Sequence, residues 1–373
     1  MAKAKFSLNS RGKFETKVWD GTYLPDGSKH RLIFWSSKSS ADLERKVNEF
    51  KHRISTGDQL SPTLYTFGSY AEHWLATKKS AMEINTQNMY KRILDVHLAS
   101  IFDLPLSSIT NSVFQKIIND TIDRPRTCQQ IYITFKQIIR MAESDNYITV
   151  GQHQQICKDI SLPKYIRQEK RPLLDIEKAA IKTAAFSERE SAFVYLLLGC
   201  GIRRGEALAL TKFDFDFSAN TVTINKSIVF DENLSIIKNS PKSKNGFRTI
   251  PIPDDVIKII KPYVSSIPTA QLFTKADGGL VTRSAYRRLW ASIISKMNTA
   301  AGGTDSFPLI ADLSAHIFRH NYCTNLCYCV PSISTKKIAQ LLGDSERMVL
   351  EVYNHIMENK EDVSSVINLA LAL

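Results

Sequence analysis

The sequence of 373 residues is long enough for two or three domains with their own cores, since 43% of its residues are hydrophobic. Lys and Arg total 49 against 37 Asp and Glu, and the net charge of +12 favours a polyanionic partner, with DNA or RNA the leading candidate. No apolar run approaches the roughly 20 residues of a membrane span, and the charged N-terminus has no apolar core of a secretory signal, so we expect a cytoplasmic protein that contacts no membrane.

Residues 6–35 alternate in short β-like runs between turn formers, which predicts a small three-stranded antiparallel sheet. The segment that follows carries Leu43 and Val47 at helical spacing, so one face of a helix could cover this sheet. Basic and aromatic side chains would share the exposed face, and Lys13 and Trp19 are candidates for DNA contact. A solvated charged face on a stabilising appendage is the alternative.

Residues 64–158 carry apolar residues at three- and four-residue intervals in several segments, which predicts a compact all-helical unit. Thr66 is the expected N-cap of the first helix, and Asn85 or Thr86 begins the second. The outer faces hold basic residues that suit contact with a phosphate backbone: Lys78, Lys79, Lys91 and Arg92. Solubility alone would also place charge on these faces.

Prolines and charges without an apolar period mark residues 161–175 as a linker. Beyond it, Ser187 and Glu190 form a capping box for an apolar helix that ends at a glycine-containing break. Arg203 and Arg204 follow this break at the start of the next helix, where the helix N-terminus adds positive potential for a phosphate. The spacing leaves open whether both are ordinary surface residues.

Residues 220–252 are predicted to form three strands of one small sheet, with the basic segment PKSKNGF as a hairpin between the second and third strands. Lys242 or Lys244 could reach from this hairpin into a DNA groove, although hairpin lysines are usually just solvated. A predicted helix with Arg287 on a basic face follows.

Two further segments with helical periodicity, residues 316–327 and 336–357, contain His316, Arg319 and Tyr353. Together with an arginine of the segment GCGIRRGEALAL, they offer two guanidiniums, an imidazole and a phenol in a strongly basic protein. Such a set suits chemistry on a phosphodiester.

Zinc-ligand residue types also share one face of the first of these segments: His316, His320, Cys323 and Cys327. A tetrahedral zinc site needs ligands from at least two elements, so a buried helix face is the favoured interpretation. The six cysteines have no even framework spacing and are expected to be buried thiols in a reducing compartment. We expect neither a metal nor another cofactor.

Four motifs follow one another along the chain: GIRRGE, PKSKNGFRTIPIP, HIFRH and LLGDSERMVLEVYNH. They resemble, in this order, the first arginine box, the β-hairpin lysine motif, the HxxR box and the tyrosine box of the tyrosine recombinases, in particular of phage and conjugative-transposon integrases. HxxR alone occurs by chance in many proteins, whereas four motifs in the family's order and approximate spacing are strong support.

The resemblance covers nearly the whole chain and implies a multidomain, mainly α fold. Residues 1–57 would form an arm-site DNA-binding domain of sheet and helix, and residues 64–158 a helical, SAM-like core-site DNA-binding domain. Residues 172–373 would form a mixed α+β catalytic domain that ends in a tail helix. The implied function is a site-specific DNA recombinase, or integrase, that inserts or excises a mobile element.

By this resemblance, Tyr353 attacks the scissile phosphate and forms a 3′-phosphotyrosyl link, which stores the bond energy for rejoining without ATP. Arg203 and Arg319 hold the two non-bridging oxygens and stabilise the charge of the transition state. Glu206 is expected to orient its neighbours rather than to react.

His316 would assist proton transfer, and Lys242 would protonate the departing 5′-oxygen, with Lys244 as its rival because the motif admits more than one alignment. One position departs from the family, since Asp344 stands where a histidine is usual. A histidine would donate to a phosphate oxygen, whereas an ionised aspartate would repel it. Asp344 is therefore turned away or paired with a cation, or the enzyme is slower than its relatives.

Double-stranded DNA with core and arm sites is the implied partner, and four protomers are expected on it. An excisionase or a host DNA-bending protein is a further candidate partner. The apolar tail, residues 363–373, is expected to form a helix that packs either on a neighbouring protomer or on its own chain. The alternatives are a resolvase or type IB topoisomerase, against which the arm-type domain argues, and a DNA-binding protein without enzymatic activity.

Overall fold

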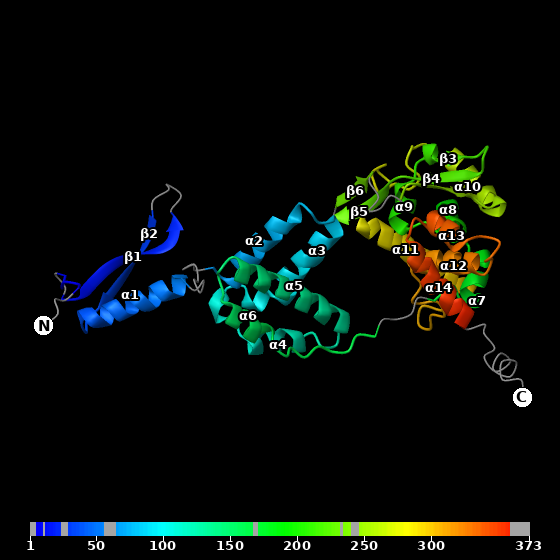
Figure 1. Cartoon of the computed structure of the whole chain (residues 1–373). Helices are drawn as coiled ribbons and strands as arrows, with labels where there is room; N and C mark the ends of the chain where they lie inside the picture. The colour runs from blue at the N-terminus through cyan, green and yellow to red at the C-terminus, as the bar shows by residue number, and fades with distance from the viewer. Residues whose placement is uncertain are drawn as a thin grey trace, which may run out of the picture. The chain divides into compact units, whose positions relative to one another are not determined.

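The computed structural model describes residues 5–9, 12–23, 29–55, 65–166, 171–231, 234–239 and 246–358. The chain is mainly helical and divides into two compact units, Met1–Ile166 and Arg167–Leu373 (Figure 1). The hydrophobic clusters of the described residues each lie within one of these units. No helix in the described ranges is long and apolar enough to cross a membrane.

The N-terminal part of the first unit contains β1 (Phe14–Tyr23), β2 (Lys29–Ser36) and α1 (Ser40–Ser55). The strands pair antiparallel, and Val18 packs with Leu43 and Val47 of α1, the residues whose spacing predicted this contact. The expected third strand is reduced, among the described residues, to one bridge between Leu8 and Phe14. A two-stranded ribbon is marginally stable alone, so the helix supplies the cover that it needs.

The helical part of the first unit contains α2 (Phe67–Lys79), α3 (Ile84–Arg92), α4 (Asn111–Asn119), α5 (Pro125–Ser144) and α6 (Val150–Cys157). Its core is built on large aromatic side chains: Phe67, Tyr70, Trp74, Phe114 and Phe135. Thr66 caps α2 as predicted, because its hydroxyl accepts from the backbone N–H of Ser69. The second helix begins slightly earlier than expected, with Glu83 as its N-cap.

The helices of the second unit are α7 (Asp175–Thr183), α8 (Glu188–Cys200), α9 (Arg204–Ala209), α10 (Asp254–Ser266), α11 (Arg283–Ala300), α12 (Ala315–Cys327), α13 (Thr335–Leu342) and α14 (Glu346–Glu358). Its main core surrounds the apolar helix α8, whose Phe193 and Leu197 are fully buried. The predicted capping box of Ser187 and Glu190 begins this helix. Glu190 also accepts hydrogen bonds from Ser292 and Lys296, and these bonds join α8 to α11.

The strands of the second unit are β3 (Phe215–Asp216), β4 (Thr221–Ile224), β5 (Ser227–Asp231), β6 (Leu234–Lys238) and β7 (Arg248–Pro251). They form two sheets, β3-β4-β7 and β5-β6, and not the single sheet predicted. The first predicted strand breaks before β5, where the Lys226 ammonium lies 2.6 Å from both carboxylate oxygens of Asp214. Among the described strands, β6 pairs with β5 and β7 with β4, so the basic segment between β6 and β7 joins two sheets and the predicted hairpin is wrong.

The predicted helix of residues 336–357 is divided in two. Gly343 ends α13 in the left-handed conformation (φ 63°), and α14 starts three residues later. A second cluster packs α12, α13 and α14 together and includes Cys323, Cys327 and Ile338. The predicted buried face of α12 is confirmed at its two cysteines, whereas His316 is exposed and His320 is half-buried. Cys329, by contrast, is exposed. The apolar tail, residues 363–373, lies outside the described residues.

Candidate active site

Arg203 is held by a sharp break between two helices. α8 ends immediately before Gly201, which has a φ of 59°, and a Cβ there would lie 2.4 Å from the ring of Tyr322. α9 begins at Arg204, so Arg203 is its N-cap, and the Arg203 backbone N–H donates to the carboxylate of Glu206 at 2.8 Å. The glycine break predicted from the sequence therefore positions this arginine.

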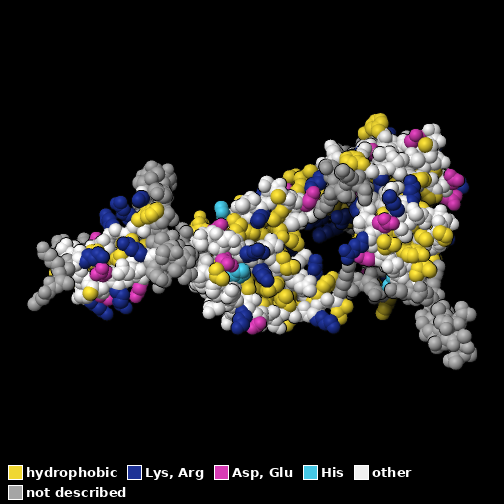
Figure 2. Space-filling model, in the orientation of Figure 1, with side chains coloured by type: hydrophobic (Ala, Val, Ile, Leu, Met, Phe, Trp, Pro, Cys, Tyr) yellow, Lys and Arg dark blue, Asp and Glu magenta, His cyan; other side chains and the backbone are white. Residues whose placement is uncertain are grey.

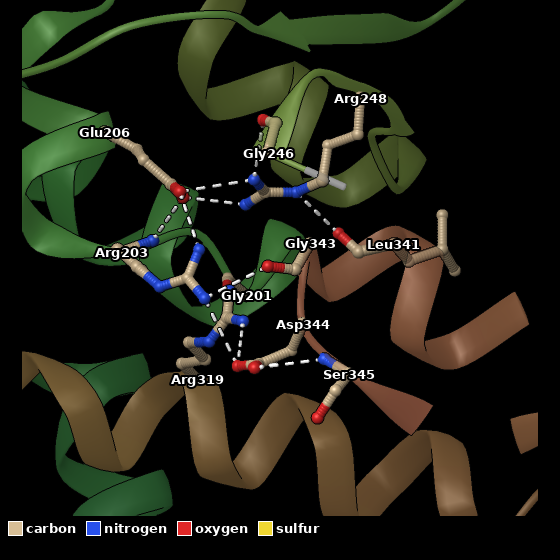
Figure 3. A network of polar contacts seen from close by, with 10 residues as sticks. All are labelled: Gly201, Arg203, Glu206, Gly246, Arg248, Arg319, Leu341, Gly343, Asp344 and Ser345. Carbon is tan, nitrogen blue, oxygen red and sulfur yellow. Dashed lines mark hydrogen bonds and ion pairs between the residues drawn. The ribbon is translucent and has the colours of Figure 1, made fainter. Parts of the chain in front are cut away.

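Glu206 is buried and joins two arginines. Its carboxylate accepts from Arg203 Nη1 at 3.0 Å, and from Arg248 Nη1 and Nη2 at 3.2 and 2.7 Å (Figure 3). Burial acts to raise the pKa of Glu206, but the hydrogen bonds and the charge of Arg248, aided by Arg203, lower it below its ordinary value. The carboxylate is therefore ionised at neutral pH and orients both guanidiniums.

Arg248 is a residue of this network that sequence reasoning missed. Its side chain is only 5% exposed, and its Nε donates to the carbonyl oxygen of Leu341 at 2.8 Å, near the end of α13. The alternation of β7 contained a signal, because Arg248 and Ile250 face the buried side of the strand. A charge on the inward face of a strand requires a partner, and here Glu206 provides it.

Arg319 reaches the same network from α12. Its side chain is 4% exposed, and its Nη1 donates to the carbonyl oxygen of Gly201 at 3.0 Å. Burial, followed by the charge of Arg203, lowers the pKa of Arg319 to about 10, so the guanidinium remains protonated at neutral pH. Arg203 and Arg319, which are 116 positions apart in the numbering, thus lie at one site.

Asp344 connects these two arginines through one oxygen atom. Its Oδ2 accepts from Arg319 Nη2 at 3.0 Å and from Arg203 Nη2 at 3.2 Å, while Oδ1 accepts from the backbone N–H of Ser345 at 3.1 Å (Figure 3). Burial acts to raise the pKa of Asp344, but the hydrogen bond and charge of Arg319, with the charge of Arg203, lower it. Of the alternatives that the sequence left open, Asp344 is paired, and with both arginines.

Tyr353 and His316 lie on the helices around this pair. Tyr353 is half-buried on α14, where it packs against the cluster that α12, α13 and α14 share. His316 is exposed in the first turn of α12, three residues before Arg319. Lys242, and its rival Lys244, lie outside the described residues.

The described residues that were predicted to contact DNA are exposed in their own units, except Lys13, which is half-buried, and Lys244 lies outside the described residues. In the N-terminal sheet, the Lys13 ammonium lies 4.0 Å from the ring centroid of Trp35, and the Lys29 ammonium lies 4.8 Å from that of Trp19. Figure 2 shows Lys and Arg side chains spread over the surface of this sheet and of the helical part. Exposed basic residues occupy the last turns of α2 and α3 and the surface of α11: Lys78, Lys79, Lys91, Arg92 and Arg287.

Comparisons with known proteins extend over both units. The chain matches the phage integrase family over residues 169–360 and the phage integrase N-terminal SAM-like domain over residues 66–122. A tyrosine recombinase XerC-like protein of Caldanaerobacter subterraneus subsp. tengcongensis is 22% identical over 360 residues, which cover 87% of this chain and 88% of the relative.

Solved structures show the same fold. A fragment of the Tn1549 transposon integrase in complex with a circular intermediate DNA superposes with a TM-score of 0.63 at 18% identity, covering 80% of this chain and 100% of that chain. A λ integrase tetramer bound to a Holliday junction has a TM-score of 0.55 at 15% identity, covering 92% of this chain and 96% of that chain.

The fold, the paired arginine boxes and the tyrosine helix define a site-specific DNA recombinase of the tyrosine type. The chain belongs to the phage integrase family, which it matches over most of its second unit. The family, the mainly α fold and the recombinase function predicted from four short motifs are therefore confirmed.

Proposed function

We propose that this recombinase cuts and rejoins double-stranded DNA with Tyr353 as its nucleophile. The phenolic oxygen loses its proton to a base and attacks the scissile phosphorus, the bond from phosphorus to the 5′-oxygen breaks, and the leaving oxygen takes up a proton from an acid to become a 5′-hydroxyl. The 3′-phosphotyrosyl link keeps the energy of the broken phosphodiester. Attack on it by the 5′-hydroxyl of another strand rejoins DNA and releases the tyrosine, so no ATP is required.

The convergence of two guanidiniums on a single anionic oxygen is the observation that carries this proposal. Arg203 and Arg319 each place an Nη2 atom within 3.2 Å of Oδ2 of Asp344, and a non-bridging phosphate oxygen offers the same charge and acceptor capacity. Additional negative charge develops on these oxygens in the pentacoordinate transition state, which the two arginines would stabilise. Glu206 and Arg248 act as positioning residues for Arg203.

We assign proton transfer to His316 and to a lysine of the basic segment between β6 and β7. His316 precedes Arg319 by one turn on α12 and would assist in holding the phosphate and in proton transfer. Lys242 would protonate the leaving 5′-oxygen, with Lys244 as the alternative. These groups provide the charge and the proton that metal-dependent nucleases obtain from a metal ion and water, so cleavage should persist in EDTA.

DNA binding is distributed along the chain in this proposal. Residues 172–373 carry the chemistry, residues 64–158 bind the core site, and residues 1–57 bind the arm site with the exposed face of the N-terminal sheet. Strand exchange joins two duplexes with two cleavages each, so four protomers would act together, an arrangement supported by the λ integrase tetramer. The enzyme would work on DNA in the bacterial cytoplasm to move a phage or transposon, with an excisionase or a DNA-bending protein as candidate regulators.

A suicide DNA substrate, nicked so that the 5′-hydroxyl fragment is lost after cleavage, tests this assignment. Wild-type protein should accumulate a covalent adduct, and Tyr353→Phe should form none. Arg203→Ala and Arg319→Ala should each slow adduct formation by about a hundredfold or more while gel-shift binding is largely retained. Adduct formation by Tyr353→Phe would overturn the assignment of the nucleophile, and loss of binding in both arginine variants would make these residues DNA anchors.

A further inference from the structure

Asp344 occupies the position between the two arginine boxes that a phosphate oxygen would need. Both Nη2 atoms donate to its Oδ2, at 3.0 Å from Arg319 and 3.2 Å from Arg203. Arg203 Nη2 also donates to the carbonyl oxygen of Gly343 at 3.1 Å, so both protons of this nitrogen are already used. A phosphate oxygen that bonds to the same nitrogen must therefore replace one of these acceptors.

The backbone of this region can remain in place while the carboxylate leaves. The N–H of Asp344 donates to the carbonyl oxygen of Ala339 at 3.0 Å, and that of Gly343 to Gln340 at 3.1 Å, which are helix-ending bonds of α13. Neither bond involves the Asp344 side chain. That side chain is 34% exposed, so rotation about its own torsions can carry the carboxylate toward solvent. The Gly343 carbonyl has no such freedom, because it is part of the turn.

Two charged acceptors cannot share this position. An ionised Asp344 beside a phosphodiester would place two negative charges within a few ångströms of one another. Without an anion between them, the guanidiniums of Arg203 and Arg319 would instead face each other, and the charge of Arg203 already lowers the pKa of Arg319. An exchangeable carboxylate resolves both problems. It neutralises the two arginines before DNA binds, and the DNA phosphate then replaces it.

We infer that Asp344 is a positioning residue that stands in for the scissile phosphate, holding Arg203 and Arg319 at their phosphate-binding separation until the DNA phosphate displaces it. This inference rests on the proposed roles of the two arginines. It predicts that Asp344 competes with substrate: the arginines are preorganised, and every phosphate that binds them must first remove the carboxylate.

Asp344→Asn tests the competition, because it keeps the shape of the side chain and removes its charge. Inorganic sulfate serves as the probe in isothermal titration of the full-length protein without DNA, at constant ionic strength. We expect Asp344→Asn to bind sulfate about tenfold more tightly than the wild type, and Arg203→Ala in the same background to remove this gain. Asp255→Asn, which deletes one charge from an exposed ion pair with Lys258 on α10, is the matched control and should change nothing.

A second measurement follows adduct formation on the suicide substrate at increasing DNA concentration. Asp344→Asn should reach its half-maximal rate at about one tenth of the wild-type DNA concentration. Equal sulfate affinity in the two proteins, or slower adduct formation by Asp344→Asn at every DNA concentration, would overturn the inference. The sulfate titration involves no chemistry at Tyr353, so it can fail or succeed independently of the proposed nucleophile.

Discussion

Arg248→Met tests whether the buried pair of Arg248 and Glu206 sets the geometry around Arg203. The substitution retains much of the side-chain volume but removes two hydrogen bonds to the Glu206 carboxylate and one each to the carbonyl oxygens of Leu341 and Gly246. Both members of the pair are more than 90% buried, and removal of one partner from a buried ion pair costs about 3–5 kcal/mol. We expect about 3 kcal/mol, because the partly exposed Arg203 still neutralises part of the charge.

Hydrogen exchange of the backbone amides of α8 and β7 measures this loss locally, without assuming that both units unfold together. A loss of about 3 kcal/mol corresponds to exchange about a hundredfold faster. Arg248→Met combined with Glu206→Gln should recover at least half of the lost stability, since no buried charge is left without its partner. Adduct formation should remain slow, because Arg203 has lost its carboxylate. Wild-type exchange rates in the single variant, or lower stability in the double variant, would refute this reasoning.

Three further variants probe other parts of the molecule. Burial acts to raise the pKa of Glu190, but its hydrogen bonds to Lys296, Ser292 and Ser187 lower it from 4.5 to about 2, so the ionised carboxylate stabilises the fold above pH 4.5 and this contribution is lost as the pH falls toward 2. Glu190→Gln should therefore differ most from wild type in urea unfolding at pH 7 and little at pH 2. Gly201→Ala should lower stability by about 2–4 kcal/mol and suppress adduct formation, because a Cβ at positive φ would meet the Tyr322 ring; an unchanged melting temperature would contradict this. Trp19→Ala should weaken binding of duplex DNA about tenfold in fluorescence anisotropy, and equal affinity would remove the sheet face from the DNA interface.

Local sequence signals predicted much of the fold. The cap at Thr66, the capping box of Ser187 and Glu190 and the break at Gly201 depend on side chains only a few positions away, and each occurs as expected. The packing of Leu43 and Val47 of α1 on the N-terminal sheet followed from apolar spacing in the same way. These features could be predicted because their physical cause lies within one turn or one helix face.

Features that depend on distant residues could not be predicted. An ion pair with Asp214 lies at the strand break of Lys226, and the assignment of β5 and β7 to different sheets depends on which strands pair. Arg248 joins Arg203 at the Glu206 carboxylate only because the folded chain brings the side chain of Arg248 to α9, 42 positions away. The sequence likewise could not decide whether the Asp344 side chain is turned away or paired. Its partners, Arg203 and Arg319, are 141 and 25 positions away.

The carboxylates of Glu206 and Asp344 both bond to Arg203, but they differ in how easily each can leave this arginine. The difference follows from burial. Glu206 is 8% exposed and bonds to Arg248 through both oxygens, so its departure would leave a buried guanidinium without its ion-pair partner. Asp344 is 34% exposed and bonds to its arginines through one oxygen, and Arg319 keeps a bond to the Gly201 carbonyl when that oxygen leaves. Glu206 is therefore a permanent part of the site, whereas Asp344 can exchange. Only the exchangeable carboxylate lies between Arg203 and Arg319, where an incoming phosphate would have to bind.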